Sequence, residues 1–412
     1  MSVRVAIVAE SFPPDVNGVA HCALRVAEHL VLRGHQPMVI APAPTRNPGG
    51  GGAGPFPWPV VRLPSVPLPR YRSFRIGLPI RKLHTALTSH RAELVHLASP
   101  FVLGSSAVAA AGRERLPTVA VYQTDVPAYA RVYRTGGLGE AAAWRWLRRI
   151  HNAADRTLAP SAASAASLRE HGVQRVWLWG RGVDTERFDP ARRSPRLRHE
   201  LAPGGELLVG YVGRLAPEKR VDLLWQVAGL PGVRLVIVGD GPAGPGLRRA
   251  LPGAMFLGAR HGTDLATIYA SLDVFVHSGC HETFGQTIQE AAASGLPVVA
   301  PAVGGPLDLV DDGVTGCLVP PGDADALTAA IRRLAADPLA RAAMGRAARQ
   351  RVLARSWTAL GDQLIGHYAA VLGERCPLAG ELAGDQGDAV APGDLLAGGQ
   401  VGRARLGVVN LR

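Results

Sequence analysis

Short apolar, β-branched segments alternate with segments of helical periodicity along almost the whole chain. This alternation predicts parallel strands joined by crossover helices, packed as doubly wound sheets. We expect strands at 4–9, 37–41, 60–63, 94–98, 118–122, 157–159 and 175–179, and then at 207–213, 234–238, 255–257, 273–277, 297–300 and 317–319. We expect helices near 18–33, 75–89, 103–113, 140–154 and 162–171, and then near 220–229, 244–251, 264–271, 284–294, 323–336, 338–353 and 357–372. The predicted fold class is therefore α/β, with two Rossmann-like domains.

The two series of strands predict two domains, and 412 residues are enough for each domain to bury its own core. Residues 184–205 are charged and rich in turn-forming residues, and we expect them to link a first domain at 1–183 to a second at 206–356. Residues 43–59 are dominated by Pro and Gly and are expected to form a loop. The tail at 373–412 lacks periodicity and is expected to be disordered.

The segment 281–300 has the most specific chemical pattern in the chain. Thr283 and Gln286 fit a capping box at the start of a helix, and Gly295 stands where a left-handed C-terminal cap belongs. Glu282 then lies in the loop before the helix, and Glu290 lies about two turns into it. The segment therefore predicts a strand, a loop, a helix and a further strand, with a carboxylate on either side of the helix start.

The start of this helix suits a phosphorylated ligand. The backbone amides of Phe284, Gly285 and Gln286 point out of the helix start, where the helix dipole favours an anion, and Gly285 allows a close approach to the backbone. A phosphate on these amides, with Glu282 on a sugar and Glu290 on a ribose, would make a nucleotide-sugar site. An ordinary capped helix with two solvated glutamates remains open from the residues alone.

A second phosphate candidate follows the expected strand 207–213. Arg214 and Lys219 flank a turn at the carboxyl end of this strand, where open α/β sheets bind ligands. Arg offers a planar fork for a diphosphate and Lys a compact charge. The chain has only two lysines, so Lys219 is not compositional background. A solvated basic turn is the alternative interpretation.

Three motifs, in this order along the chain, resemble the retaining glycosyltransferases of family 4, which have the GT-B fold. They are Gly182-Val-Asp-Thr-Glu-Arg-Phe188, Gly213-Arg-Leu-x-x-Glu-Lys219 and Glu282-Thr-Phe-Gly…Glu290. The likeness covers roughly residues 3–370. A closer similarity, to actinobacterial GDP-mannose-dependent α-mannosyltransferases that act on lipid acceptors, rests on Ala6-Ile-Val-Ala-Glu-Ser-Phe-Pro-Pro-Asp-Val-Asn-Gly18, Tyr122-Gln-Thr-Asp-Val-Pro127 and Trp179-Gly-Arg-Gly-Val-Asp184.

The resemblance implies two domains that face each other across a cleft, with the helix at 357–372 crossing back to the first domain. It implies that Glu290 binds the ribose and that Glu282 binds the sugar hydroxyls at positions 3 and 4. Arg214, Lys219 and the helix amides would stabilise the departing diphosphate, so that no metal or other cofactor is required. The leaving phosphate itself would act as the base for the acceptor hydroxyl.

Further donor contacts are predicted in both domains. Gly18 follows the first strand and would let backbone amides approach the donor, although a plain turn glycine is equally compatible with the sequence. Gln123 stands where many relatives have a His that touches the transferred sugar, which leaves Asp125 to bind a hydroxyl or to cap the next turn. The resemblance places Gly213, Gly241 and Arg260 beside the nucleotide. Two more residues, Arg181 and Asp184, are expected to line the cleft near the hinge, and a structural role in holding the linker turn is the alternative for Asp184.

Composition limits the classes of binding partner and the cellular location that we expect for the protein. The formal charge of +12 comes from basic clusters spread over several segments without aromatic platforms, which argues against nucleic acid. The four cysteines lack metal or redox spacing, and no apolar run approaches the ~20 residues of a membrane helix. Glu10 interrupts the first strand too early for a signal peptide. We therefore expect a cytoplasmic protein, with the basic stretch 70–83 as a candidate for peripheral contact with the anionic inner face of the plasma membrane; an ordinary amphipathic segment is the alternative.

The predicted function is retaining transfer of a hexose, mannose from GDP-mannose, to a hydroxyl of a lipid-linked or glycan acceptor. One alternative is a family-4 transferase that uses UDP-glucose or another UDP-sugar on a small molecule. A nucleotide-dependent oxidoreductase is suggested by the fingerprint Gly239-Asp-Gly-Pro-Ala-Gly244, but the strand 255–257 is not followed by the acidic residue that would hold the ribose. A degenerate binding protein is the last alternative.

Overall fold

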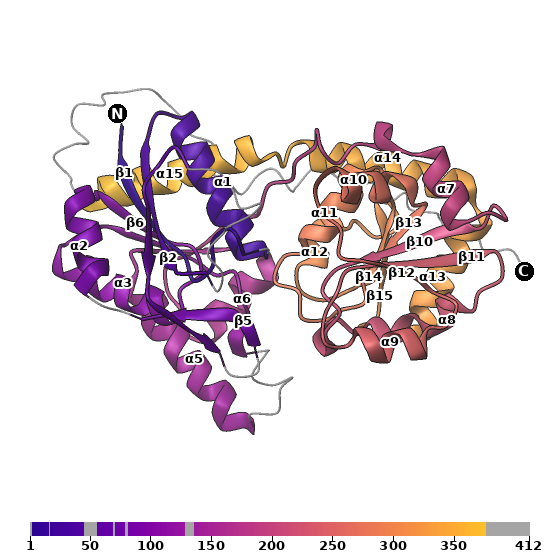
Figure 1. The fold of residues 1–412 in the computed structure, drawn as a ribbon, viewed down its shortest axis with the longest axis horizontal. Helices are drawn as coiled ribbons and strands as arrows, with labels where there is room; N and C mark the ends of the chain where they lie inside the picture. Colours follow the sequence, from indigo (N-terminus) through magenta and orange to yellow (C-terminus); the bar gives the residue numbers. More distant parts are fainter. Residues whose placement is uncertain are drawn as a thin grey trace, which may run out of the picture. The chain divides into compact units, whose positions relative to one another are not determined.

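Seven parallel strands form the first sheet, in the order β3-β2-β1-β6-β7-β8-β9 (Figure 1). The computed structural model describes residues 2–15, 17–44, 56–68, 71–78, 81–127 and 136–375, so most of the expected loop at 43–59 and almost all of the expected disordered tail lie outside the described residues. The strands are β1 (Arg4–Val8), β2 (Gln36–Pro42), β3 (Val60–Leu63), β6 (Leu94–Leu97), β7 (Thr118–Val121), β8 (Arg156–Ala159) and β9 (Val176–Leu178). Each lies at its predicted position.

Helices cover both faces of this sheet. They are α1 (Gly18–Leu32), α2 (Arg81–His90), α3 (Val102–Arg113), α5 (Gly136–Ala153) and α6 (Ala162–Glu170). Successive residues of β1 enter different cores: Val5 and Ile7 pack in one cluster, and Ala6 and Val8 in the other. Burial on both faces explains why the parallel strands are continuous apolar runs in the sequence.

Six parallel strands form the second sheet, in the order β12-β11-β10-β13-β14-β15. They are β10 (Leu207–Val212), β11 (Val233–Val238), β12 (Met255–Gly258), β13 (Val274–Val276), β14 (Val298–Pro301) and β15 (Gly316–Val319). Its helices are η2 (Pro217–Lys219), η3 (Val221–Leu224), α8 (Trp225–Ala228), α9 (Gly244–Ala250), α10 (Gly262–Ser271), α11 (Gln286–Ala293), α12 (Pro306–Leu309), α13 (Ala324–Ala336) and α14 (Pro338–Leu353). The two parallel sheets with their interleaved helices confirm the predicted α/β fold class.

The predicted helix at 75–89 is partly wrong, because a β-hairpin occupies its first residues. The strands β4 (Ser65–Leu68) and β5 (Tyr71–Gly77) pair in antiparallel fashion, and α2 begins only at Arg81. The sequence contains the reason: Leu78 precedes a proline, and a residue before proline is disfavoured in the helical conformation. A helix that continues across this position is therefore disfavoured.

The segment predicted as a linker packs on the second sheet. It contains η1 (Pro190–Arg192) and α7 (Pro195–Leu201). Phe188 and Leu201 are buried in the core cluster of the second sheet, and the rings of Phe188 and Tyr269 lie 5.5 Å apart between centroids. The limits of the two domains remain predictions, and the structure shows that 188–202 contributes to the second core.

The helix α15 (Trp357–Arg375) follows the second sheet in sequence but packs on the first. Its residues Leu364 and Tyr368 are buried in the cluster that contains Val5 of β1. The Tyr368 hydroxyl hydrogen-bonds His96 Nδ1 at 2.8 Å, and the indole N–H of Trp179 donates to the carbonyl of Leu360 at 2.8 Å. Among the described residues, no helix is long and apolar enough to cross a membrane.

Candidate active site

The candidate site lies at the carboxyl ends of strands where the strand order reverses. In the second sheet β10 lies between β11 and β13, so the loops after β10 and β13 leave the sheet on either side of a switch point. Open α/β sheets bind ligands at such points. The loop after β10 carries Arg214 and Lys219, and the loop after β13 carries Glu282. Topology therefore brings together two predicted motifs that are far apart in sequence.

Lys219 and Glu282 form an ion pair at this point. Lys219 Nζ donates to Glu282 Oε2 at 2.6 Å, and each side chain is only 20% exposed. The hydroxyl of Ser278 donates to the carbonyl of Lys219 at 2.8 Å, which ties the two loops together. Burial alone would raise the pKa of Glu282, but the charge and the hydrogen bond of Lys219 are the main effects that outweigh it, and the pKa falls to about 2. Glu282 is therefore an anion at neutral pH.

Arg214 begins the same loop and reaches toward solvent. Its side chain is 44% exposed, and Nη1 lies 3.9 Å from a carboxylate oxygen of the buried Glu218. Its carbonyl accepts a hydrogen bond from the Tyr211 hydroxyl at 3.2 Å. The backbone is thus fixed while the guanidinium can reach a ligand. Sequence reasoning did not assign a role to Glu218, whose burial shows that it supports this loop.

The predicted glycines Gly213 and Gly241 lie where two loops approach closely. A Cβ on Gly241 would lie 2.3 Å from the carbonyl oxygen of Leu215, and Gly241 has a φ of +156°. A Cβ on Gly213 would lie 2.8 Å from the Tyr211 hydroxyl. Gly241 therefore lets the turn after β11 pack against the loop that carries Arg214 and Lys219. Arg260 is exposed after β12.

The predicted capping box at the start of α11 is wrong. The N-cap is Gly285, at a φ of +105°, and no side chain of the described residues caps the helix. Thr283 Oγ1 instead donates to the carbonyl of Gln123 at 3.4 Å, and Gln286 Nε2 donates to the carbonyl of Gly182 at 3.1 Å. The left-handed turn at Gly285 redirects the chain, so both side chains reach segments of the first sheet.

The rest of the helix agrees with its sequence pattern. Phe284 is buried in the second core, which anchors the start of α11. The amides of the first turn have no partner within the helix, as at every helix start, so the anion site at 284–286 stays a prediction. Gly295 has a φ of +77°, which confirms the predicted left-handed C-terminal turn.

Glu290 lies on α11 beside an aromatic hydroxyl. The Tyr269 hydroxyl donates to Glu290 Oε2 at 3.2 Å. Burial raises the pKa of Glu290 to about 7, although the hydrogen bond from Tyr269 and the charge of Arg187 act in the opposite direction. A carboxyl with this pKa can accept or donate at neutral pH, which suits a diol such as that of a ribose.

Residues of the first sheet meet around Arg181. Arg181 Nη2 donates to Gln123 Oε1 at 2.9 Å, and Gln123 Nε2 donates to the carbonyl of Ala98. A Cβ on Gly18, the first residue of α1, would lie 2.9 Å from Arg181 Nη1. The structure therefore brings Gly18 and Gln123 together, with Gln123 orienting Arg181. Asp125 lies further along the same loop and is half-buried.

Two side chains at the site were missed by sequence reasoning. His277 lies directly after β13 and is buried, and Gln289 Nε2 donates to the carbonyl of Arg181 at 2.8 Å. A polar residue at the end of an otherwise apolar strand was the available signal for His277. Nothing local in the sequence indicated the contact of Gln289. The described residues contain no group of three or more His, Cys, Asp or Glu that could hold a metal ion.

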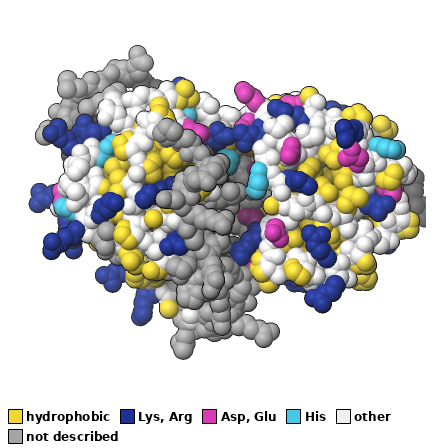
Figure 2. All heavy atoms as spheres, viewed as in Figure 1, with side chains coloured by type: hydrophobic (Ala, Val, Ile, Leu, Met, Phe, Trp, Pro, Cys, Tyr) yellow, Lys and Arg dark blue, Asp and Glu magenta, His cyan; other side chains and the backbone are white. Residues whose placement is uncertain are grey.

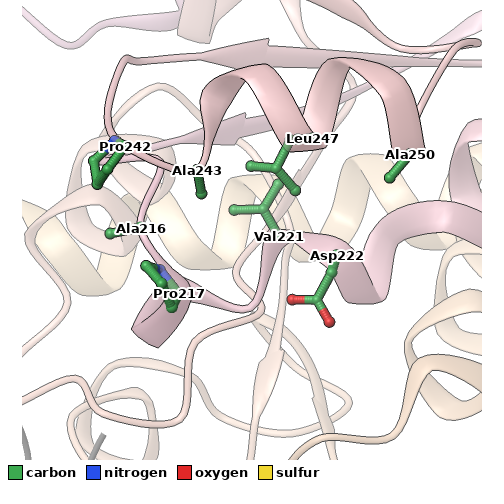
Figure 3. Close-up of a pocket in the computed structure, with 9 residues that line it drawn as sticks. Ala216, Pro217, Val221, Asp222, Pro242, Ala243, Leu247 and Ala250 are labelled. Atoms are coloured by element: carbon green, nitrogen blue, oxygen red, sulfur yellow. The ribbon is translucent and has the colours of Figure 1, made fainter. Parts of the chain in front are cut away.

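A pocket of about 330 Å³ lies between the 216–222 segment and α9 (Figure 3). Val221 and Leu247 face each other across it, and Asp222 is the charged residue among its described lining residues. Of the described residues that line the pocket, none is a predicted site residue. The pocket borders the loop of Lys219 without containing the candidate chemistry.

Comparison with known proteins decides the family. Residues 16–187 match the description "Glycosyltransferase Family 4", and residues 206–337 match "Glycosyl transferases group 1". A GDP-mannose-dependent alpha-mannosyltransferase from Mycobacterium tuberculosis is 49% identical, over 90% of this chain and 98% of that protein. A protein of the same name from Corynebacterium glutamicum is 45% identical, over 91% of each chain. The chain belongs to glycosyltransferase family 4.

Solved structures agree with the fold of this glycosyltransferase. Sucrose-phosphate synthase from Thermosynechococcus elongatus superposes with a TM-score of 0.75 at 24% identity, over 90% of this chain and 100% of that chain. An Anabaena protein crystallised with UDP gives a TM-score of 0.72 at 22% identity, over 89% of this chain and 100% of that chain. At these identities the likeness shows the fold, which is GT-B as predicted.

Proposed function

We propose that this glycosyltransferase moves mannose from GDP-mannose to an acceptor hydroxyl with retention at the anomeric carbon. The largely buried Lys219–Glu282 pair at the switch point of the second sheet is the observation that carries the proposal. It combines an anion for sugar hydroxyls with a cation for a diphosphate. The choice of donor is supported by the names of the two actinobacterial relatives, which are 45–49% identical over most of the chain.

In the proposed reaction the charges of the site act on the leaving group. The bond between the anomeric carbon and the β-phosphate oxygen breaks, and its electron pair stays on that oxygen. Arg214, Lys219 and the amides at the start of α11 stabilise the resulting charge, which is electrostatic catalysis. The acceptor oxygen forms the new bond on the same face of the sugar, and its proton passes to the leaving phosphate. These cationic groups supply the charge that a metal ion supplies in other transferases.

The remaining predicted residues bind the rest of the donor. Glu282 accepts hydrogen bonds from sugar hydroxyls, for which its low pKa is suitable. Glu290 binds the ribose beside Tyr269. Gly18 and Gln123 approach the sugar from the first sheet, with Asp125 as a candidate contact to the acceptor. Arg181 lies over Gly18 and adds positive charge on that side.

A lipid-linked acceptor and peripheral attachment to an anionic membrane are the finer parts of the proposal. Arg75 of the stretch 70–83 is engaged by Ser65, to whose hydroxyl and carbonyl it donates at 2.7 and 2.6 Å. A better supported surface is α5, where Trp146 is 40% exposed between the exposed Arg145 and Arg149. An aromatic side chain between arginines suits the interface of an anionic bilayer.

The distribution of Lys and Arg on the surface also bears on whether the protein binds nucleic acid. On the face drawn in Figure 2, Lys and Arg side chains are scattered among other types rather than gathered in a stripe.

Replacing Arg145 and Arg149 of α5 with Ala should reduce co-sedimentation with vesicles containing anionic phospholipid, whereas replacing the exposed Arg196 and Arg192 should not. Equal loss in both double variants would contradict a role for α5.

The test of the function is transfer itself. Purified protein is incubated with GDP-mannose and a lipid extract, GDP release is followed, and the product is examined by mass spectrometry and by NMR of the anomeric proton. We expect GDP release with a new α-mannoside, and little release with UDP-glucose. Turnover of UDP-glucose at a rate equal to or above that of GDP-mannose would refute the donor assignment.

A further inference from the structure

His277 is a buried side chain without an evident task in the unliganded site. It is 2% exposed, and neither of its ring nitrogens makes a hydrogen bond to the described residues. The backbone of Gly279 interacts with the ring and raises the pKa of His277, but its geometry falls short of a formed hydrogen bond. Buried polar side chains almost always have a partner, and an exception at an active site calls for an explanation. A state in which His277 acquires a partner would explain its burial.

The nearest candidate is the carboxylate of Glu282. His277 Nε2 lies 3.9 Å from Glu282 Oε2, and Lys219 Nζ lies 2.6 Å from the same oxygen. The Glu282 oxygen thus stands between a bonded cation and an imidazole nitrogen just beyond hydrogen-bonding distance. A movement of roughly 1 Å would bring the imidazole into range.

The proposed reaction favours such a movement. The ammonium of Lys219 has three N–H donors, and a shift of this group toward the diphosphate would lengthen its 2.6 Å contact with Glu282. The largely buried carboxylate would then have a weakened contact with its cation, which is disfavoured. Arg181 is a second positive charge that lowers the pKa of Glu282, but its guanidinium is hydrogen-bonded to Gln123. His277 is the neighbour placed to compensate.

The ring has the protonation state for this task. Burial, with a further contribution from Lys219, lowers the pKa of His277 to about 4, against the opposing effect of Glu282. The imidazole is therefore neutral at neutral pH and carries one N–H, which in the Nε2–H tautomer donates to Glu282. A neutral donor holds the carboxylate in place without competing with Lys219 for the diphosphate.

We propose that His277 is a positioning residue that takes over Glu282 Oε2 from Lys219 when the donor binds, which leaves Lys219 Nζ for the diphosphate. The proposal rests on the proposed function. It assigns to His277 no contact with substrate. Its role is to keep Glu282 ionised and correctly oriented toward the sugar after the exchange of partners.

The first test separates turnover from nucleotide binding. His277→Leu removes the donor, and His277→Gln supplies an amide N–H near the position of Nε2. We expect His277→Leu to bind GDP as wild type does and to lose about 10- to 100-fold in kcat, the cost of a hydrogen bond to a charged group. His277→Gln should recover most of this loss. Wild-type kcat in His277→Leu, or equal loss in both variants, would overturn the proposal.

A second test does not depend on any variant folding. A crystal structure of the wild-type protein with a non-transferable GDP-mannose analogue should show Lys219 on the diphosphate and His277 Nε2 within about 3.2 Å of Glu282. A structure in which Lys219 is still bonded to Glu282 and His277 is unpaired would overturn the proposed exchange of partners. Failure of wild-type protein to bind or use GDP-mannose would instead count against the proposed function, so the two failures are distinguishable.

Discussion

Replacing Lys219 with Met tests the electrostatic part of the account. The variant keeps the length of the side chain and removes the charge that lies 2.6 Å from Glu282. The pKa of Glu282 is about 2 rather than 4.5, and at 1.36 kcal/mol per pKa unit this difference is about 3 kcal/mol, to which Lys219 is the largest favourable contributor. Because this pKa is depressed, the stabilisation is present above about pH 4.5 and is lost as the pH falls toward 2. Lys219→Met should therefore lower the Tm at neutral pH.

The effect on turnover should be larger than the effect on binding. Removing one group that stabilises a leaving oxyanion costs about 10²- to 10³-fold in kcat. GDP release at saturating GDP-mannose measures kcat, and isothermal titration measures the Kd of GDP. We expect kcat to fall by this amount while the Kd of GDP rises by less than about tenfold.

The chain offers a matched control in its only other lysine. Lys82 lies on the exposed side of α2 and donates to the carbonyl of Arg62 at 3.1 Å, so Lys82→Met should leave kcat unchanged. The double variant Lys219→Met/Glu282→Gln should recover Tm without activity, because both charges of a buried pair are then absent. A Lys219→Met enzyme that keeps kcat within about tenfold of wild type would refute the reasoning.

Three further predictions follow from burial and packing. Raising the pH from about 5 to about 8 should raise the Tm of Glu290→Gln relative to that of wild type. The pKa of Glu290 is raised to about 7, so the stability that its protonated carboxyl contributes is lost as the pH rises through that value. An equal Tm difference between variant and wild type at both pH values would contradict this. Gly241→Ala should lower stability by about 1–3 kcal/mol and reduce kcat, because its Cβ would meet the Leu215 carbonyl, whereas Gly246→Ala, with open space around its Cβ, should not; equal Tm values would contradict the packing role. Arg181→Met should weaken GDP-mannose binding more than GDP binding, and equal effects in titration would place Arg181 away from the sugar.

Much of the fold was predictable because buried parallel strands have a simple pattern. A strand such as Val233–Val238 is covered on both faces, so its apolar run is continuous and easily recognised. The hairpin at 65–77 was missed because short antiparallel strands with scattered arginines lack this pattern. The proline after Leu78 was the signal that the helix could not begin before it.

The individual residues of the site could be predicted from the sequence, but the contacts between them could not. Lys219 and Glu282 are 63 positions apart, and only the strand order β10-β13 places their loops together. The predicted capping box at Thr283 and Gln286 is wrong because the capping pattern assumes ordinary backbone dihedral angles at Gly285. Gly285 is left-handed, and the side chains of Thr283 and Gln286 bond to segments that follow strands of the first sheet. His277 was missed because its signal, a polar residue at the end of an apolar strand, does not reveal that the ring lies near Glu282.

The most direct test of the central claim is donor binding by isothermal titration calorimetry, since it requires no acceptor. Wild-type protein and the Glu290→Ala variant are titrated with GDP-mannose and with UDP-glucose. We expect wild type to bind GDP-mannose at least tenfold more tightly than UDP-glucose, a difference of about 1.4 kcal/mol, and we expect Glu290→Ala to lose this binding. Equal or tighter binding of UDP-glucose, or full affinity in Glu290→Ala, would contradict it.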